Sequence, residues 1–524
     1  MAVPVALYAL LVLPFVFHGV VGEPDLERTA LAFVYGASSG LHETAGFHYG
    51  YTVSFGYYQG LYHLLTQSAL LSPATVIAAI NVVGFVSAVA AMLFLALYMA
   101  RLFGSLAALA VCAVFGFSPV FLDLGTSGHP QVPALTLLLA GAWMLTFVTE
   151  EERTLASRIS LGLAAFVIFT AALTVRADEA MAFPFLTLVG PPTLAGDRSL
   201  WLKGAARRMG VLLAACAAFA VLSAMSYHDS NAVSEGGGFV ANFFATFYKP
   251  QTVPRGLLVF VLCTGVASIV TAAALSLTRA ARLDRVTWWA IGLLAVPTLL
   301  FWLPNSTPGR HMLFAYLAVA ILIAVLLVRT VRPAQVIAIA VLLPIANQVV
   351  AEATHGVLDR HYQWMYPLTV SRRATQSVPM GAFPWDHEAK QQAFTQLADE
   401  GRAFARACTG HVLVMSEDPH FMMMSMLELD RSVRLTSLRE ADTRVIRASG
   451  TRCTADFVEK QAPSRRDTLK DFLQVSSYDN WPIYFQELRR NPYDRTPVPS
   501  GRRFALEAAG PGRVAGLAPD SLTR

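Results

Sequence analysis

Long apolar stretches recur along the first two thirds of the chain, and short polar segments separate them. Each stretch approaches the roughly 20 apolar residues that a helix needs to cross a bilayer. We therefore predict about eleven membrane-spanning helices, near residues 3–22, 74–98, 103–122, 131–149, 157–175, 179–194, 208–226, 255–278, 286–304, 311–330 and 334–351. The sixth begins at Glu179 and contains Pro184, which removes a helix hydrogen bond, so we expect this span to be tilted or re-entrant.

The pattern changes after the last of these stretches. His411–Ser416 and Ser432–Ser437 have the character of strands, and Phe421–Leu429 between them has the character of a helix. Strand, helix and strand in this order are typical of a small α/β domain. We find no Gly-rich phosphate loop, no Cys/His metal spacing and no nucleophile elbow in this part of the sequence.

Charged residues divide the chain at the same place. Residues 1–350 contain 31 charged side chains, whereas the much shorter segment 351–524 contains 44. The whole chain is only 14% charged, against roughly 25% for soluble domains. The predicted fold class is therefore a membrane all-α domain at residues 1–351, followed by a C-terminal α/β domain at residues 352–524.

Lysines and arginines in the short loops predict the orientation, because such loops are retained on the cytoplasmic side. With a cytoplasmic N-terminus, twelve basic residues fall inside and five outside. The inside set is Arg101, Arg153, Arg158, Arg198, Lys203, Arg207, Arg208, Arg279, Arg282, Arg285, Arg329 and Arg332, and the outside set is Arg28, Arg176, Lys249, Arg255 and Arg310. We therefore predict a multi-pass protein of the cell inner membrane with an extracytoplasmic C-terminal domain.

The formal net charge of +5 comes largely from these loop arginines. We assign it to membrane topology, and we expect the lipid bilayer rather than nucleic acid as the partner of the charged surface.

The first outer loop is long and contains two amphipathic segments. Leu26–Val34 has helical spacing with acids at its start, and Tyr49–Leu65 is rich in tyrosine and phenylalanine. Aromatic amphipathic segments tend to lie in the membrane interface, so we expect two interfacial helices here. For the second segment, an ordinary amphipathic linker is an equal alternative.

The five cysteines also fit this division. Cys112, Cys216 and Cys263 fall within predicted spans, where a thiol behaves as a small apolar group. Cys408 and Cys453 are the two cysteines of the exported domain, where a disulfide can persist. We predict a bridge between them, and two unrelated buried thiols are the alternative.

Three carboxylates follow the first predicted span directly. Glu23, Asp25 and Glu27 lie within about a turn of its end, close to the bilayer surface. One interpretation is a solvated helix start, in which Asp25 caps the helix and Glu27 faces the positive end of its dipole. The functional interpretation is a general base that takes a proton from an acceptor hydroxyl.

Further charged and imidazole groups are predicted on the same side of the membrane. They are Asp123, His129, Arg176, Asp178, Glu179, Lys249, Arg310 and His311. Each alone is a plausible interfacial anchor, but together they place carboxylates and cations around one outward-facing cavity. Arginine suits a lipid phosphate because its guanidinium binds phosphate through two parallel hydrogen bonds. Apart from the sixth span, no acid or base lies deep in a predicted span, which favours surface chemistry over ion-coupled transport.

The order of these features resembles the GT-C superfamily of polytopic glycosyltransferases, which includes protein O-mannosyltransferases and aminoarabinose lipid A transferases. The residues that carry the resemblance are Glu23-Pro24-Asp25-Leu26-Glu27, Ser118-Pro119, Gly128-His129-Pro130, Arg176-Ala177-Asp178-Glu179 and Gly309-Arg310-His311. It covers roughly residues 1–350. Many members have an acid just before the fourth span, where this chain has Gly128-His129-Pro130, with Asp123 some residues earlier.

The resemblance implies an inverting transfer of a sugar from a polyprenyl-phosphate donor to an extracytoplasmic glycolipid, glycan or protein. Asp25 would be the catalytic base, with Glu23 or Glu27 as substitutes. Arg176 and Arg310, with Lys249 or His311, would stabilise the departing phosphate, and Asp123, His129, Asp178 and Glu179 would form a second acidic site.

The sequence requires no metal, whether a divalent metal assists is left open, and the cofactor stays unassigned. Two other functions remain open at this point. A transporter or flippase for a lipid-linked saccharide is one, and it predicts internal inverted repeats and buried charge. A non-catalytic membrane assembly protein of the same fold is the other, and its C-terminal domain would then be the working part.

Overall fold

The structure is a computed structural model, and it describes residues 2–16, 73–127, 129–150, 152–190, 198–226, 253–278, 283, 285–304, 309–361, 411–416 and 451–457. Its helices are α1 (Ala2–Val12), η1 (Leu13–Phe15), α6 (Pro73–Phe103), α7 (Ser105–Gly116), α8 (Pro119–Ser127), α9 (Gln131–Val148), α10 (Leu155–Val175), η3 (Ala177–Ala182), α11 (Phe183–Leu188), α12 (Arg198–Ser226), α14 (Val253–Thr264), α15 (Val266–Ser276), α16 (Arg285–Trp302), η8 (Gly309–Met312), α17 (Leu313–Thr330) and α18 (Pro333–His361). The two interfacial helices predicted in the first outer loop lie outside the described residues.

Seven helices in the described part of the chain are long and apolar enough to cross a membrane. They are α6, α9, α10, α12, α16, α17 and α18, and each coincides with a predicted span. An eighth candidate is α14 with α15, which meet at an angle of 89°. The other three predicted spans fall on shorter helices, so the mostly helical membrane fold is confirmed, while the count of eleven stays a prediction.

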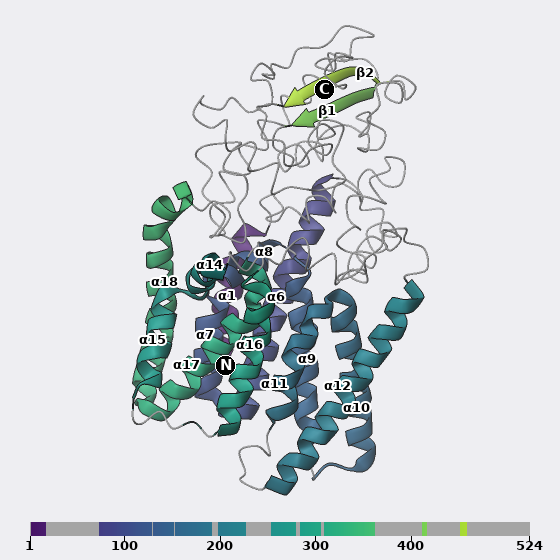
Figure 1. Cartoon of the computed structure of the whole chain (residues 1–524), viewed down its shortest axis with the longest axis vertical. Helices are drawn as coiled ribbons and strands as arrows, with labels where there is room; N and C mark the ends of the chain where they lie inside the picture. The colour runs from purple at the N-terminus through teal and green to yellow at the C-terminus, as the bar shows by residue number, and fades with distance from the viewer. Residues whose placement is uncertain are drawn as a thin grey trace.

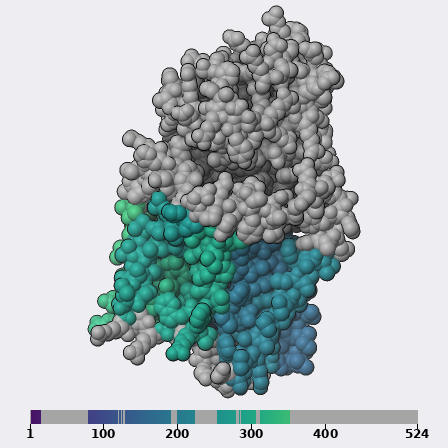
Figure 2. Space-filling model, in the orientation of Figure 1, coloured from purple at the N-terminus to yellow at the C-terminus, as the bar shows by residue number. Residues whose placement is uncertain are grey.

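Apolar side chains cover the outside of the bundle as well as its inside. Most residues of α9 and α17 are buried, whereas only a minority of those in α10, α12 and α18 are. On α10, Leu155, Ile159, Leu163 and Val167 are all exposed and follow each other at four-residue intervals, which places them on one face. Contact of such a large apolar surface with water is unfavourable, whereas contact with lipid tails is favourable. In Figure 2, the blue part of the chain, which includes α10 and α12, lies beside the teal and green part, which includes α14 to α18.

The sixth predicted span is a broken element. η3 and α11 together replace a continuous helix, and α11 has a proline in its first turn. The carbonyls at the end of α11 are satisfied from α12: Arg208 Nε donates to Thr187 O at 3.0 Å, and Trp201 Nε1 donates to Leu188 O at 3.1 Å. The last carbonyls of a helix have no partner within the helix. Where water is excluded, they therefore need donors from another segment.

We expect the change Arg208→Leu to lower the free energy of unfolding by about 1–3 kcal/mol, because Arg208 is 1% exposed and its loss leaves the Thr187 carbonyl without its donor. Thermal unfolding of the purified protein in detergent checks this. Arg207→Leu on the same helix is the matched control. Equal stability of the two variants would contradict the capping role.

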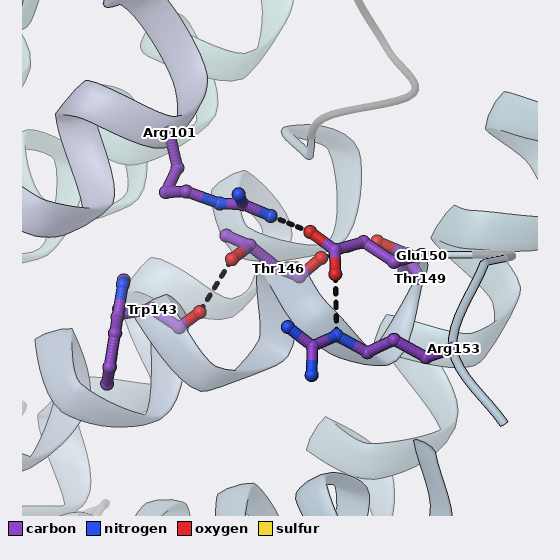
Figure 3. Close-up of polar contacts among 6 residues, drawn as sticks. All are labelled: Arg101, Trp143, Thr146, Thr149, Glu150 and Arg153. Carbon is purple, nitrogen blue, oxygen red and sulfur yellow. Dashed lines mark hydrogen bonds and ion pairs between the residues drawn. The ribbon is translucent and has the colours of Figure 1, made fainter. Parts of the chain in front are cut away.

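Just after the C-terminal end of α9, one carboxylate forms ion pairs with two arginines. Glu150 forms ion pairs with Arg101 of α6 and with Arg153, whose Nε lies 2.6 Å from Glu150 Oε2. Figure 3 shows the two arginines reaching Glu150 from different sides. Both guanidinium carbons also lie over the Phe147 ring, at 4.5 and 4.7 Å from its centre. This half-exposed cluster ties α6 to the α9–α10 turn at the end where loop arginines predict the cytoplasm.

Two strands are described beyond α18. β1 (His411–Ser416) coincides with the predicted strand and pairs in parallel with β2 (Thr451–Phe457). The predicted helix Phe421–Leu429 and strand Ser432–Ser437 lie outside the described residues. Cys453 falls in β2, but Cys408 lies outside them, so the disulfide and the α/β domain remain predictions.

Candidate functional site

Polar side chains from four separate segments meet at one end of the bundle. α9 begins at this end and α10 finishes there, so the turn before α9 and the η3 segment after α10 are neighbours. α16 also ends here, and it contacts both η3 and η8. Figure 1 shows α8 and α14 at the same end of the helices. Residues far apart in the sequence therefore converge where the sequence predicts the outer membrane surface.

An ion pair between a buried arginine and a partly buried carboxylate forms the centre of this cluster. Arg176 ends α10 in an extended conformation, with φ −153°, and its side chain is 6% exposed. Its Nε and one terminal nitrogen each lie 2.7 Å from one of the two carboxylate oxygens of Asp178. Such a two-pronged pair fixes the orientation of the guanidinium plane. It also neutralises the charge of Arg176 within the site.

His311 of η8 connects this pair to α9. Its Nδ1 lies 3.3 Å from a terminal nitrogen of Arg176 and 3.1 Å from Nε2 of Gln131. A guanidinium can only donate, so we assign Nδ1 as the acceptor and place the ring proton on Nε2. The imidazole stacks on Trp302, with ring centres 4.1 Å apart and planes 16° apart.

His129 adds a second imidazole beside Gln131. The backbone N–H of Gln131 donates to His129 Nδ1 at 3.3 Å, and the His129 side chain is buried. A continuous series of contacts therefore runs from His129 through Gln131, His311 and Arg176 to Asp178. It joins the start of α9, η8 and η3.

Glu179 is the acid of this cluster that lacks a strong partner. Glu179 is 3% exposed, and its Oε2 has no hydrogen-bond partner among the residues that the structure describes. Burial raises the pKa of this carboxyl well above its usual range, Asp178 raises it further, and Arg176 opposes the shift. Glu179 therefore contributes a buried carboxyl with a raised pKa to the cluster at this end of the bundle.

Helix α14 is seated against the end of α16 beside this cluster. A Cβ atom at Gly256 would lie only 2.5 Å from the carbonyl oxygen of Leu303 and 3.0 Å from its Cα. Because the obstacle is backbone, a larger residue would force the two helices apart. The glycine thus lets α14 lie next to Trp302 and η8.

The structure brings together five of the predicted site residues, namely His129, Arg176, Asp178, Glu179 and His311. Asp123 and Arg310 are placed by their backbones, in α8 and η8 respectively, and their side chains are not described. The predicted catalytic acids and the loop lysine lie outside the described residues. These are Glu23, Asp25, Glu27 and Lys249.

Two site residues were missed at the level of sequence. Gln131 opens an apolar span directly after His129-Pro130, and a polar residue at that position was the available signal. Trp302 closes another span shortly before the Gly309-Arg310-His311 motif. An aromatic residue at a span end is so common at membrane interfaces that it gave no specific signal.

Chemically, the cluster offers hydrogen-bond donors with fixed directions. The Nε2–H of His311 and the guanidinium of Arg176 suit an oxyanion or a polar hydroxylated ligand, and the carboxyl of Glu179 adds a polar group beside them. Within the described ranges, no three His, Cys, Asp or Glu side chains are grouped so that they could hold a metal ion.

No protein-family model matches the sequence, and no curated protein sequence is significantly similar to it. Solved structures do match. ArnT from Cupriavidus metallidurans bound to undecaprenyl phosphate superposes with a TM-score of 0.51 and 13% identity, over 81% of this chain and 84% of that one. The oligosaccharyltransferase AglB from Archaeoglobus fulgidus, in complex with an inhibitory peptide and a dolichol-phosphate, gives a TM-score of 0.49 and 12% identity, over 87% of this chain and 69% of that one.

The ArnT structure, at a TM-score of 0.51, confirms for the fold the resemblance seen in the sequence. At 13% identity, the likeness shows the fold alone. Function has to be argued from the residues of the site.

Proposed function

We propose that this chain is an integral membrane glycosyltransferase, which moves a sugar from a polyprenyl-phosphate donor to an extracytoplasmic acceptor. The observation that supports this most is the largely buried polar cluster at one end of an apolar helix bundle, made by His129, Gln131, Arg176, Asp178 and His311. A lipid-linked donor reaches such a site from the bilayer, and its phosphate needs preorganised donors. The shared fold with an ArnT structure that holds undecaprenyl phosphate agrees with this.

In this proposal, Asp25 is the catalytic base, and Glu23 or Glu27 are its alternatives. All three lie outside the described residues, so the assignment rests on their position after the first predicted span. The base takes the proton of the acceptor hydroxyl as its oxygen attacks the anomeric carbon. The carbon–oxygen bond to the lipid phosphate breaks on the opposite face, so the configuration inverts.

Arg176 and His311 receive the departing phosphate, together with Arg310 and Lys249. The bidentate contact with Asp178 holds the Arg176 guanidinium in place before the donor arrives, which lowers the cost of orienting it. The same contact offsets its charge, and this weakens the hold on the free lipid phosphate after transfer. Arg310 and Lys249 then supply charge for the initial binding.

His311→Ala should weaken binding of undecaprenyl phosphate about tenfold, because it removes one donor to the phosphate and the stacking partner of Trp302. Native mass spectrometry of the purified protein titrated with the lipid measures this. Leu300→Ala, at an exposed position near the same end of α16, is the control. Equal affinity in both variants would remove His311 from the phosphate site.

The same titration tests the class of ligand. Undecaprenol has the same tail and no phosphate, so we expect it to compete poorly. Equal competition by undecaprenol would mean that the chain recognises the lipid tail alone, and the proposed donor site would then be wrong.

A further inference from the structure

Two consecutive amide side chains of α18 reach two interruptions in other helices. Asn347 contacts the break between α14 and α15, and Gln348 contacts the break between α7 and α8. Both lie in a span whose face is largely apolar, and Asn347 is 1% exposed. Burying an amide side chain inside a membrane is unfavourable in free energy unless the amide is hydrogen-bonded. Two amides at successive positions therefore suggest a specific structural role.

At the first break, Asn347 substitutes for a missing helix cap. Gly265 precedes α15 with φ +95° and has no side chain to cap the helix. Asn347 Oδ1 accepts from the Ser268 N–H at 3.2 Å, and its Nδ2 donates to Ser268 Oγ at 2.7 Å. A Cβ atom at Gly265 would lie 2.1 Å from Asn347 Cγ, so the glycine also makes room for this amide.

At the second break, Gln348 satisfies the carbonyl that ends α7. Its Nε2 donates to Phe117 O at 3.0 Å. On the other side of the break, Ser118 Oγ accepts from the Phe121 N–H at 3.4 Å and so begins α8. Two adjacent residues of one helix therefore form hydrogen bonds with backbone groups that lack a helical partner at the two breaks.

The two breaks set the direction of the segments that surround the site. α8 and α14 begin or end at them, and both contact η8, which carries His311, as well as each other. Figure 1 shows α8 and α14 together at this end of the bundle. A shift at either break would therefore move α8 or α14 relative to η8 and His311.

We propose that Asn347 and Gln348 are positioning residues, which hold α8 and α14 in the directions that shape the lipid-phosphate site around η8. This inference rests on the proposed function for its ligand, but its structural part stands separately. The hydrogen bonds of the pair go to Ser268 and Phe117 at the two breaks, and none joins it to His311 or Arg176 in the described part of the chain, so we infer that it acts through the breaks.

The test compares Asn347→Leu and Gln348→Met with Val349→Ala, a control at an adjacent position that is 62% exposed. Gln348→Met is nearly isosteric and removes one hydrogen bond. We therefore expect this variant to fold even if Asn347→Leu does not. Asn347→Asp keeps the acceptor for the Ser268 N–H and serves as the conservative rescue. Each full-length protein is titrated with undecaprenyl phosphate, and hydrogen exchange is measured on peptides from α8, α14 and η8.

We expect Asn347→Leu and Gln348→Met to weaken binding about tenfold and to raise exchange in η8 and in α14 or α8, respectively. Val349→Ala should match the wild type, and Asn347→Asp should recover most of the affinity. Unchanged affinity in folded variants overturns the proposal, even if exchange at the breaks rises, because the pair would then only stabilise the fold.

The two proposals fail in different ways. If the wild-type protein itself does not bind undecaprenyl phosphate, the proposed function fails, and exchange alone decides about the pair. Raised exchange in η8 would then support the positioning role, and unchanged exchange in η8 would overturn it.

Discussion

Asp25→Asn is expected to lower the rate of sugar transfer by about 10²–10⁴-fold, which is the usual contribution of a general base. The amide keeps the size of the carboxylate but cannot take the proton of the acceptor hydroxyl. Donor binding should change little, because the phosphate contacts lie on other segments of the chain. Glycolipid and glycan profiles of cells that carry only the variant, together with donor titration of the purified protein, measure both effects.

Glu43→Gln is the matched control, since Glu43 is an acid of the same first outer loop and has no assigned role. Glu23→Gln and Glu27→Gln show whether the neighbouring acids substitute for Asp25. Wild-type glycan profiles with Asp25→Asn, and a loss with one of these neighbours, would transfer the role of base to that neighbour.

Asp178→Ala is expected to lower the free energy of unfolding by about 3–5 kcal/mol, because it leaves the buried Arg176 guanidinium without its counter-ion. Arg176→Ala should also destabilise the protein, since Asp178 then loses its two hydrogen bonds. The double variant Arg176→Ala/Asp178→Ala removes both charges and should recover much of the stability. Thermal unfolding of the four proteins in one detergent forms a double-mutant cycle.

Activity should not follow stability in this cycle. The double variant lacks the oriented guanidinium, so we expect transfer to stay at least about tenfold below the wild type even where folding recovers. Recovery of both properties would show that the pair is structural only. Single variants as stable as the wild type would show that the ion pair contributes little.

The spans were predictable because the bilayer imposes one requirement, namely that a helix that crosses it is long and apolar. α6, α9, α10, α12, α16, α17 and α18 each satisfy it with a long apolar sequence, and hydropathy finds them without knowledge of their packing. The break at Gly265 was not predicted, because a hydropathy average over about 20 residues is insensitive to one glycine. Its 89° bend depends on a left-handed backbone angle and on an amide that is supplied by α18.

The site was predictable in part for a related reason. Arg176, Asp178 and His311 are polar residues at the ends of apolar stretches, where sequence makes them conspicuous. The pairing of Arg176 with Asp178, and the contact of His311 with Gln131, depend on how η3, η8 and α9 meet. These contacts join positions far apart in the chain, so spacing along the sequence does not contain them.

The most direct test of the central claim is whether the purified protein releases polyprenyl phosphate from a lipid-linked sugar. Lipids from cells that lack this chain would be incubated with wild-type protein or with Asp25→Asn, in the presence of an envelope fraction as acceptor. Mass spectrometry then measures free polyprenyl phosphate. We predict release with the wild type and almost none with Asp25→Asn. Unchanged lipids with folded wild-type protein would contradict glycosyl transfer and favour a flippase or an assembly role.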